Sequence, residues 1–402
     1  MSKKVFLIIG ASINAGLMLF FAFYLLSLPY VHGDDMMLIE YGAKIKNIVL
    51  GLEKKPPKKD FIFINVAYDK QLIDKLDTNG FSMGKQAIVD RKKLARFFEV
   101  LAKKPKNQKF ILCDIHFADS ASINTCEGDS VSNDIALAQA LRKIPNILLS
   151  YHLDENNKPE YPIFRDIPRG ISDYDTPNNV FLKFKLLYQD SIKTTPLLMY
   201  EYLYKKELSK GRLFDKLGDN FIFNTFIVDL PIRNYDLFHT KETYKIDNLE
   251  NILSGAMKEE DILEYVKDRI VVIGDFSLYD NHETIYGETA GPLLLLNTYL
   301  ALERGDNVVS FSLILCLYAG FWVASFLAFR ISTNQHNINQ RWKRLFSFLS
   351  YFLILAFTSM LCYFMFDVSL SILYLSVYLF ILRYILLQIQ RFILRLRAYQ
   401  TP

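Results

Sequence analysis

The stretch VVSFSLILCLYAGFWVASFLAF, residues 308–329, decides the architecture of this 402-residue protein. It carries no charged side chain, and about 20 apolar residues are enough for a helix to cross about 30 Å of hydrocarbon. Three further stretches, 5–28, 345–366 and 368–387, have the same character, and their only charge is Arg383 near the end of the last one. The sequence therefore predicts one N-terminal and three C-terminal transmembrane helices.

The first of these stretches follows Lys3 and Lys4, as the apolar part of a signal peptide does. A signal peptide has an apolar core of about 7–15 residues and a cleavage site with small side chains. Residues 5–28 are longer than that and run into Pro29 and Tyr30. We interpret this stretch as a retained membrane anchor.

The positive-inside rule gives an orientation for the four helices. Residues 1–4, 330–344 and 388–402 are rich in Lys and Arg and contain no Asp or Glu. We expect these three segments to be cytoplasmic. Residues 30–307 are then extracytoplasmic, and the turn at Asp367 is a short hairpin on the same side as they are.

The overall composition excludes several classes of protein. Apolar residues make up 51% and charged residues 22% of the chain, which excludes an intrinsically disordered chain. The net charge of +4 gives no reason to expect a nucleic-acid partner. Cys113 and Cys126 lie in the extracytoplasmic segment, where a disulfide would be permitted, and both the paired and the unpaired state remain open.

The segment between the first two transmembrane stretches is long enough for one large domain. Apolar, β-branched runs alternate with helical patterns, which is typical of a mostly parallel sheet covered on both faces. We predict a three-layer α/β domain. Its expected strands are 61–66, 110–115, 147–151, 221–228 and 270–274, and its expected helices are 36–52, 91–102, 135–141, 196–206, 261–266 and 293–302.

Two polar groups follow strands of this predicted sheet. Asp114 and His116 come at the end of one strand, and Asp275, Asp280 and His282 come after the last one. In open α/β sheets, ligands bind outside the carboxyl ends of the strands. These five residues are therefore the candidate binding site for a cation or a small polar ligand. The alternative is that they cap helices and bind loop amides, as Asp and Asn do at such turns.

The sequence contains no phosphate-binding loop, dinucleotide-binding fingerprint, nucleophile elbow or zinc-binding helix motif. We therefore expect no cofactor, no metal and no enzymatic activity. Asn14 and Arg383 lie inside the predicted membrane helices, where such residues are candidates for a function. We expect Asn14 to join helices through hydrogen bonds and Arg383 to extend to the cytoplasmic surface.

An anchor, a large outer α/β domain and three C-terminal spans together resemble bacterial receptors with a CHASE domain of type 2, the cyclase- and histidine-kinase-associated sensory extracellular domain. The resemblance covers residues 60–390, approximately, and is weakest over 154–220. In place of the family's polar helix start, this chain has the apolar run Ala-Gly-Pro-Leu-Leu-Leu-Leu at 290–296. The matching stretches are FIFINVAYD at 61–69, Asp90-Arg91 with Leu94 and Leu101, ILCDIHF at 111–117, NDIALAQAL at 133–141, and RIVVIGD at 269–275 with Asp280, Gly291 and Asn297.

The resemblance implies a sensory protein of the bacterial inner membrane. Receptors of this family usually continue into a cyclase, kinase or phosphatase, whereas no such domain is recognisable in this sequence. We therefore expect a sensor that binds a ligand or an envelope protein and signals through a separate cytoplasmic effector. The alternative is a non-catalytic scaffold subunit of an envelope complex. A homo-oligomer is compatible with both.

Overall fold

The computed structural model divides the chain into two compact units, which we describe separately. The first unit comprises residues 54–208 and 228–304, and the second comprises residues 1–53, 209–227 and 305–402. The structure describes residues 3–29, 33–53, 55–76, 81–121, 129–176, 179–211, 214–238, 243–255, 257–277, 280–333 and 340–400.

The first unit is built on a mostly parallel sheet, as predicted. Within the described residues this sheet has seven strands in the order β15-β1-β16-β4-β5-β6, and β7 pairs with β5. All pairs are parallel except β5 with β6. The strands are β1 (Phe61–Asn65), β4 (Phe110–Cys113), β5 (Ile147–Leu153), β6 (Pro159–Glu160), β7 (Arg169–Ile171), β15 (Ile246–Asn248) and β16 (Ile270–Gly274).

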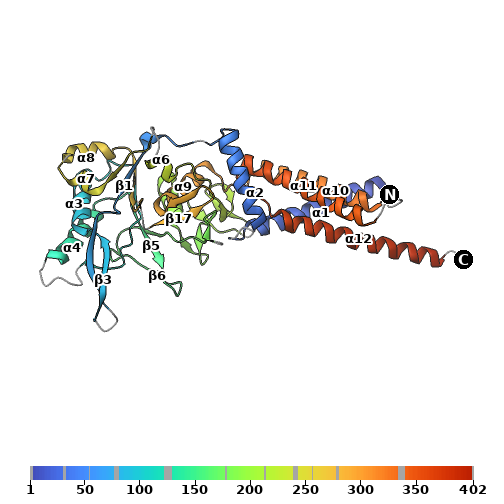
Figure 1. The fold of residues 1–402 in the computed structure, drawn as a ribbon, viewed down its shortest axis with the longest axis horizontal. Helices are drawn as coiled ribbons and strands as arrows, with labels where there is room; N and C mark the ends of the chain where they lie inside the picture. The colour runs from blue at the N-terminus through green and yellow to red at the C-terminus, as the bar shows by residue number, and fades with distance from the viewer. Residues whose placement is uncertain are drawn as a thin grey trace. The chain divides into compact units, whose positions relative to one another are not determined.

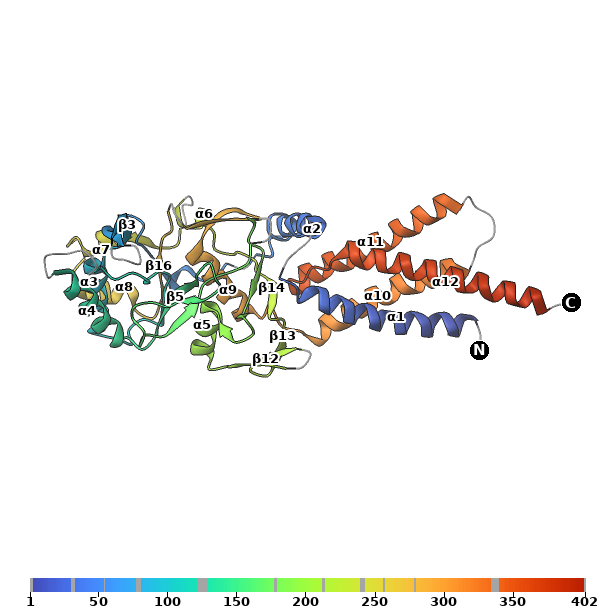
Figure 2. The same cartoon turned by 90° about the horizontal axis from the view of Figure 1, so that it is seen from below.

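Helices cover both faces of this sheet, which gives the predicted three layers. Figures 1 and 2 show α3 (Arg91–Ala102), α7 (Leu249–Leu253) and α8 (Glu259–Val266) on one side of the strands and α9 (Gly291–Arg304) on the other. α4 (Asp129–Arg142) packs beside α3, and α5 (Thr195–Tyr204) packs beside α9. The apolar positions of α3 are buried at Leu94, Phe97, Phe98 and Leu101, the helical spacing seen in the sequence.

Two parts of this unit and its borders differ from the prediction. The run 221–228 is not a strand of the main sheet, because it is divided between β13 (Asn220–Ile222), which pairs with β12 (Asp215–Leu217), and β14 (Thr225–Ile227). An unpredicted hairpin of β2 (Lys70–Leu76) and β3 (Ser82–Val89) follows β1. Cys113 is a buried free thiol, and Cys126 lies outside the described residues. The other short elements are β8 (Lys183–Lys185), β9 (Leu187–Tyr188), β10 (Ile192–Lys193), β11 (Leu208–Ser209), β17 (Asn281–Thr284), β18 (Gly287–Ala290), α6 (Asn234–Phe238) and the 3₁₀ turn Lys58–Asp60.

The second unit is a bundle of four long apolar helices. They are α1 (Lys3–Leu26), α10 (Phe311–Thr333), α11 (Gln340–Phe366) and α12 (Ile372–Gln400), and each contains a segment long and apolar enough to cross a membrane. Their outward side chains are apolar as well; Phe20, Phe311 and Phe357 are largely exposed. Helices that are hydrophobic on every side are typical of membrane spans. The four apolar helices of the prediction are therefore confirmed.

Polar side chains connect the helices inside this bundle. Asn14 donates to Ser325 Oγ at 2.8 Å and accepts from Tyr378 OH at 2.7 Å, so it joins α1 to both α10 and α12, as predicted. The prediction for Arg383 was wrong: the side chain is only 4% exposed and faces the bundle. It lies on the same helical stripe as the buried residues Leu375 and Leu379, which does not face the surface.

A short amphipathic segment packs against the ends of α11 and α12. The predicted helix 36–52 is α2 (Gly33–Lys44), followed by one π-helical segment, Ile45–Val49, so regular structure ends three residues earlier than expected. Asp35 accepts from the backbone N–H of Ile372 at 3.2 Å and thereby caps α12. Lys46 forms a part-buried ion pair with Asp367. Asp35 and Asp367 therefore both help to fix helix ends.

Candidate functional site

The predicted site lies at the carboxyl edge of the central strands. β4 and β16 are neighbours in the sheet, and the backbone N–H of Asp114 donates to Ile273 O at 2.8 Å. The chain after β4 and the chain after β16 therefore leave the sheet side by side. Asp114 belongs to the first of these segments, and the second leads to Asp280 and His282.

Charged groups from the end of β5 and from the segment 280–282 act on Asp114. Burial raises the pKa of its carboxyl group to about 7, and the negative charge of Asp280 contributes to this increase. The positive charges of His152 and His282 act in the opposite direction. His282 Nε2 lies 2.8 Å from Asp280 Oδ1. Asp114 therefore changes its protonation state near neutral pH, and its negative charge favours the imidazolium form of His152.

His152 is the second centre of the site. It lies at the end of β5, and its Nδ1 atom is 2.7 Å from Asp173 Oδ1, while Asp173 Oδ2 accepts from the backbone N–H of Leu153 at 2.6 Å. Burial disfavours the imidazolium ion. The hydrogen bond with Asp173 and the negative charge of Asp114 outweigh burial, so the pKa of His152 is raised. His152 therefore gains a proton more readily than an ordinary imidazole as the pH falls.

His116 extends the site to the edge of the sheet. Its Nε2 atom is 3.1 Å from Glu160 Oε2, and its ring meets the ring of His152 edge to face at 5.3 Å between centroids. Burial and the positive charge of His152 together lower the pKa of His116 below its ordinary value, and the charge of Glu160 only partly offsets them. The two adjacent imidazoles therefore avoid being charged together.

One aromatic side chain completes the site. The ring of Tyr174 lies edge to face against His282, with 5.1 Å between centroids. Burial and the negative charges of Asp280 and Asp114 raise the pKa of the Tyr174 hydroxyl, so it remains a hydrogen-bond donor at physiological pH.

We call this group the His–Asp cluster; it consists of Asp114, His116, His152, Asp173, Asp280 and His282. The imidazole side chains are 33–44% exposed, so a solute can reach them. Among the described residues, no group of three or more His, Cys, Asp or Glu side chains is arranged to hold a metal ion. The arrangement is chemically suited to binding protons or a small polar solute through several alternating donors and acceptors.

The structure brings together four of the five residues singled out from the sequence. Asp275 lies apart: its Oδ1 atom accepts from the backbone N–H of Ser277 at 3.0 Å, and its Oδ2 atom lies 3.7 Å from Lys70 Nζ. These contacts match the alternative in which the residue stabilises a loop. Sequence reasoning missed His152, although it comes directly after the predicted strand 147–151, and missed Asp173 and Glu160, for which no sequence signal existed.

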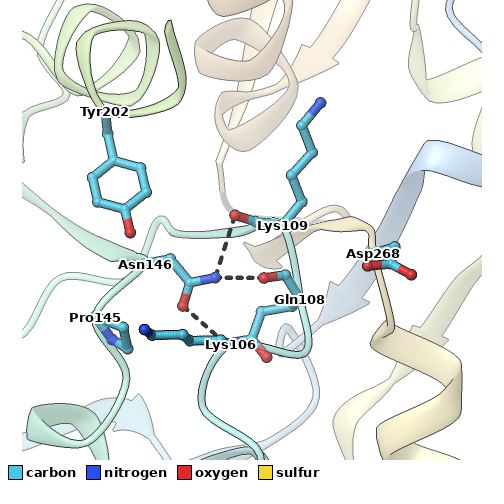
Figure 3. Close-up of a pocket in the computed structure, with 7 residues that line it drawn as sticks. All are labelled: Lys106, Gln108, Lys109, Pro145, Asn146, Tyr202 and Asp268. Atoms are coloured by element: carbon cyan, nitrogen blue, oxygen red, sulfur yellow. Dashed lines mark hydrogen bonds between the residues drawn. The ribbon is translucent and has the colours of Figure 1, made fainter. Parts of the chain in front are cut away.

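A second feature is a cavity of about 670 Å³ at the opposite edge of the sheet, where β4 and β5 begin. Figure 3 shows that polar wall groups of this cavity bind one another: Gln108 Nε2 donates to Asn146 Oδ1 at 3.1 Å, and Asn146 Nδ2 donates to Lys109 O at 3.2 Å. Because the amide nitrogens of Gln108 and Asn146 already donate to protein acceptors, we regard the His–Asp cluster as the functional candidate. The cavity is lined by Lys106, Gln108, Lys109, Pro145, Asn146, Tyr202 and Asp268.

Comparison with known proteins identifies the family. The model of the CHASE2 domain matches residues 18–327, which is more than half of the chain. This match runs from the first apolar helix, through the α/β unit, into the second apolar helix. Curated proteins and solved structures give no match. The protein is a multi-pass membrane protein with a large sensory domain between its first two membrane helices, and the chain belongs to the CHASE2 family.

Proposed function

We propose that this CHASE2 protein is a membrane-bound sensor whose α/β unit binds a small polar ligand at the His–Asp cluster and passes the signal through its membrane helices to a separate effector protein. The support for binding is the density of ionisable, solvent-accessible groups around Asp114. Ionisable groups whose pKa values are shifted by burial and by neighbouring charges occur most often at functional sites.

The connection between Asp280 and α9 carries the signalling part of the proposal. The backbone N–H of Gly291, the first residue of α9, donates to Asp280 O at 2.7 Å. A Cβ atom at Gly291 would overlap the Asp280 carboxylate, with 2.7 Å to its Oδ1 atom. Asp280 is therefore packed directly onto the beginning of α9, and movement of this carboxylate is transmitted to the helix.

The chain path links α9 to the membrane. α9 ends at Arg304, and the membrane helix α10 begins at Phe311, so only residues 305–310 separate them. In α9, every residue from Gly291 to Leu302 is buried, so the helix moves as part of a packed core. A ligand alters such an element only if it binds two of its positions with different affinities. We propose that the position of α9 is the property that the ligand changes.

The proposed orientation follows from the charge distribution. The basic segments 1–4, 330–344 and 388–402 face the cytoplasm, and the α/β unit lies on the outer side of the bacterial inner membrane. The effector then contacts the two C-terminal basic segments.

Binding is tested on the full chain in lipid nanodiscs. A panel of amino acids, dicarboxylates and polyamines is screened by the shift in unfolding temperature at pH 7. We expect a compound that stabilises the wild type and loses its effect in Asp114→Ala and Asp280→Ala. Asp166→Ala is the matched control, because Asp166 pairs with Arg142 on the exposed surface. Equal stabilisation of all variants would place binding elsewhere, and unfolding of both cluster variants would make these carboxylates purely structural.

Transmission is tested by a distance measurement across the α9–α10 connection. Spin labels on non-natural amino acids at the exposed positions Glu288 and Phe311 report this distance in the full chain. The proposal predicts that the stabilising compound changes the distance distribution in the wild type and not in His152→Gln. A constant distance, together with stable copurification of envelope proteins, would favour the scaffold function instead.

A further inference from the structure

Among the described residues of the membrane bundle, Arg383 is a buried charge without an ion-pair partner. Arg383 lies on the buried stripe of α12 that also includes Ile372, Leu375, Ser376 and Leu379. Its side chain is 4% exposed. Among the described residues, its Nε and Nη1 atoms have no hydrogen-bond partner. Two of the three guanidinium nitrogens are therefore buried within the bundle without a hydrogen-bond partner there.

No acidic side chain lies within the apolar helices to neutralise it. Residues 1–32 contain no Asp or Glu, and residues 307–402 contain only Asp367. Asp367 precedes α12, at the opposite end of the span from Arg383, and is paired with Lys46. A buried charge without a partner is strongly destabilising, and ionisable groups inside membranes are almost always paired. The missing anion must come from another molecule.

Three sources of the anion are possible in principle, and the structure favours one. A second copy of this chain has no carboxylate in its apolar helices. A lipid phosphate lies outside the hydrocarbon. Arg383 lies within it, because at 1.5 Å per residue it is about 9 Å along the helix from Ile389, the nearer end of its span. The Cα–Cβ bond of a helical residue also tilts toward the helix N-terminus, away from that end. A carboxylate on a membrane-spanning helix lies at this depth. Because Arg383 is 4% exposed, such a helix reaches it by displacing part of the packing around α12.

We propose that Arg383 is the docking point for a membrane-spanning helix of a different protein, which carries an aspartate or glutamate at the depth of the guanidinium group. The planar guanidinium binds a carboxylate through two parallel hydrogen bonds, so this pair also fixes the orientation of the partner helix. The inference goes beyond the proposed function, because it holds for a sensor and for a scaffold alike.

The first experiment uses the purified full chain, without a partner, in detergent. Arg383→Met keeps most of the side-chain volume and removes the charge, so we expect an unfolding temperature a few degrees above that of the wild type. Arg383→Lys keeps the unpaired charge and should show no such increase. Arg391→Met, in the same helix beyond the apolar span, is the control and should leave the temperature unchanged. A lower unfolding temperature for Arg383→Met would mean that the guanidinium is already satisfied within the chain and would overturn the proposal.

The second experiment identifies the partner in native membranes. A photo-crosslinking amino acid replaces Leu386, one turn from Arg383, and the adducts are sequenced by mass spectrometry. We expect an apolar helix of a second protein with an Asp or Glu in its span, and loss of the adduct in Arg383→Met but not in Arg391→Met. Arg383→Glu combined with Arg at the partner's acidic position should restore it. The docking role would be refuted if only lipid adducts formed or if no second protein were captured. It would also be refuted by a partner helix without an acidic residue or by failure of the charge exchange.

Discussion

The clearest consequence of the His–Asp cluster is a pH dependence of stability that depends on one carboxyl group. The pKa of Asp114 rises from 3.8 to about 7 on folding. Between these two values the folded protein binds one more proton than the unfolded chain does. The stabilising contribution of Asp114 is therefore fully present below pH 3.8 and is lost as the pH rises toward 7.

The size of this effect follows from the shift. One pKa unit corresponds to 1.36 kcal/mol, so a shift of roughly three units gives an upper limit of about 4 kcal/mol. Asp114→Asn removes the titration and keeps the side-chain shape. The variant should therefore gain stability over the wild type as the pH increases from 4.5 to 8. The assay is urea unfolding of the full chain in nonionic detergent, followed by circular dichroism. Parallel curves for wild type and variant across this range would refute the assignment.

Two neighbouring substitutions test the physical cause and should act in opposite directions. Asp280→Asn removes a negative charge, so the pKa of Asp114 should fall and the loss of stability should occur at lower pH. His152→Gln removes a positive charge, so the loss should occur at higher pH. Shifts of the same sign in both variants would mean that charge–charge interactions do not control Asp114.

Three further substitutions test the packing. Gly291→Ala forces a methyl group against Asp280 and should destabilise the α/β unit by about 1–3 kcal/mol in urea unfolding; an unchanged midpoint would exclude the tight contact at the start of α9. Phe97→Ala, in the buried face of α3, should cost about 3–5 kcal/mol in the same assay, and a cost below 1 kcal/mol would contradict its burial. Asn14→Leu removes the bonds to Ser325 and Tyr378 and should lower detergent-phase stability by about 0.6–1.7 kcal/mol, whereas greater stability would show that these bonds contribute nothing.

The sequence was sufficient for the parts of the fold that rest on periodic burial. The four apolar helices follow from length and hydrophobicity, and β1, β4, β5 and β16 follow from short β-branched runs. The proximity of Asp114 to the segment after β16 was also predictable, since parallel strands end at one edge of the sheet. The run 221–228 has the same composition as a buried strand, and only long-range pairing excludes it from the sheet.

The partners of the candidate residues were not predictable. Asp173 and Glu160 lie in the long connection after β5, where no apolar period fixes the chain, and only tertiary pairing brings them to His152 and His116. The buried position of Arg383 was not predictable for the same reason. Its distance from the end of the helix is compatible with an exposed side chain, and only packing of α12 against the other helices places it on the buried stripe.

The account depends most on the side of the membrane that the α/β unit occupies. A site for a sequence-specific protease can be inserted in the exposed turn beside Lys158, and the protease added to spheroplasts of cells that express the full chain. We predict cleavage in intact spheroplasts, while the same site inserted in the 330–344 segment is cut only after the membrane is permeabilised. Cleavage beside Lys158 that requires permeabilisation would place the His–Asp cluster in the cytosol and would contradict the sensory function.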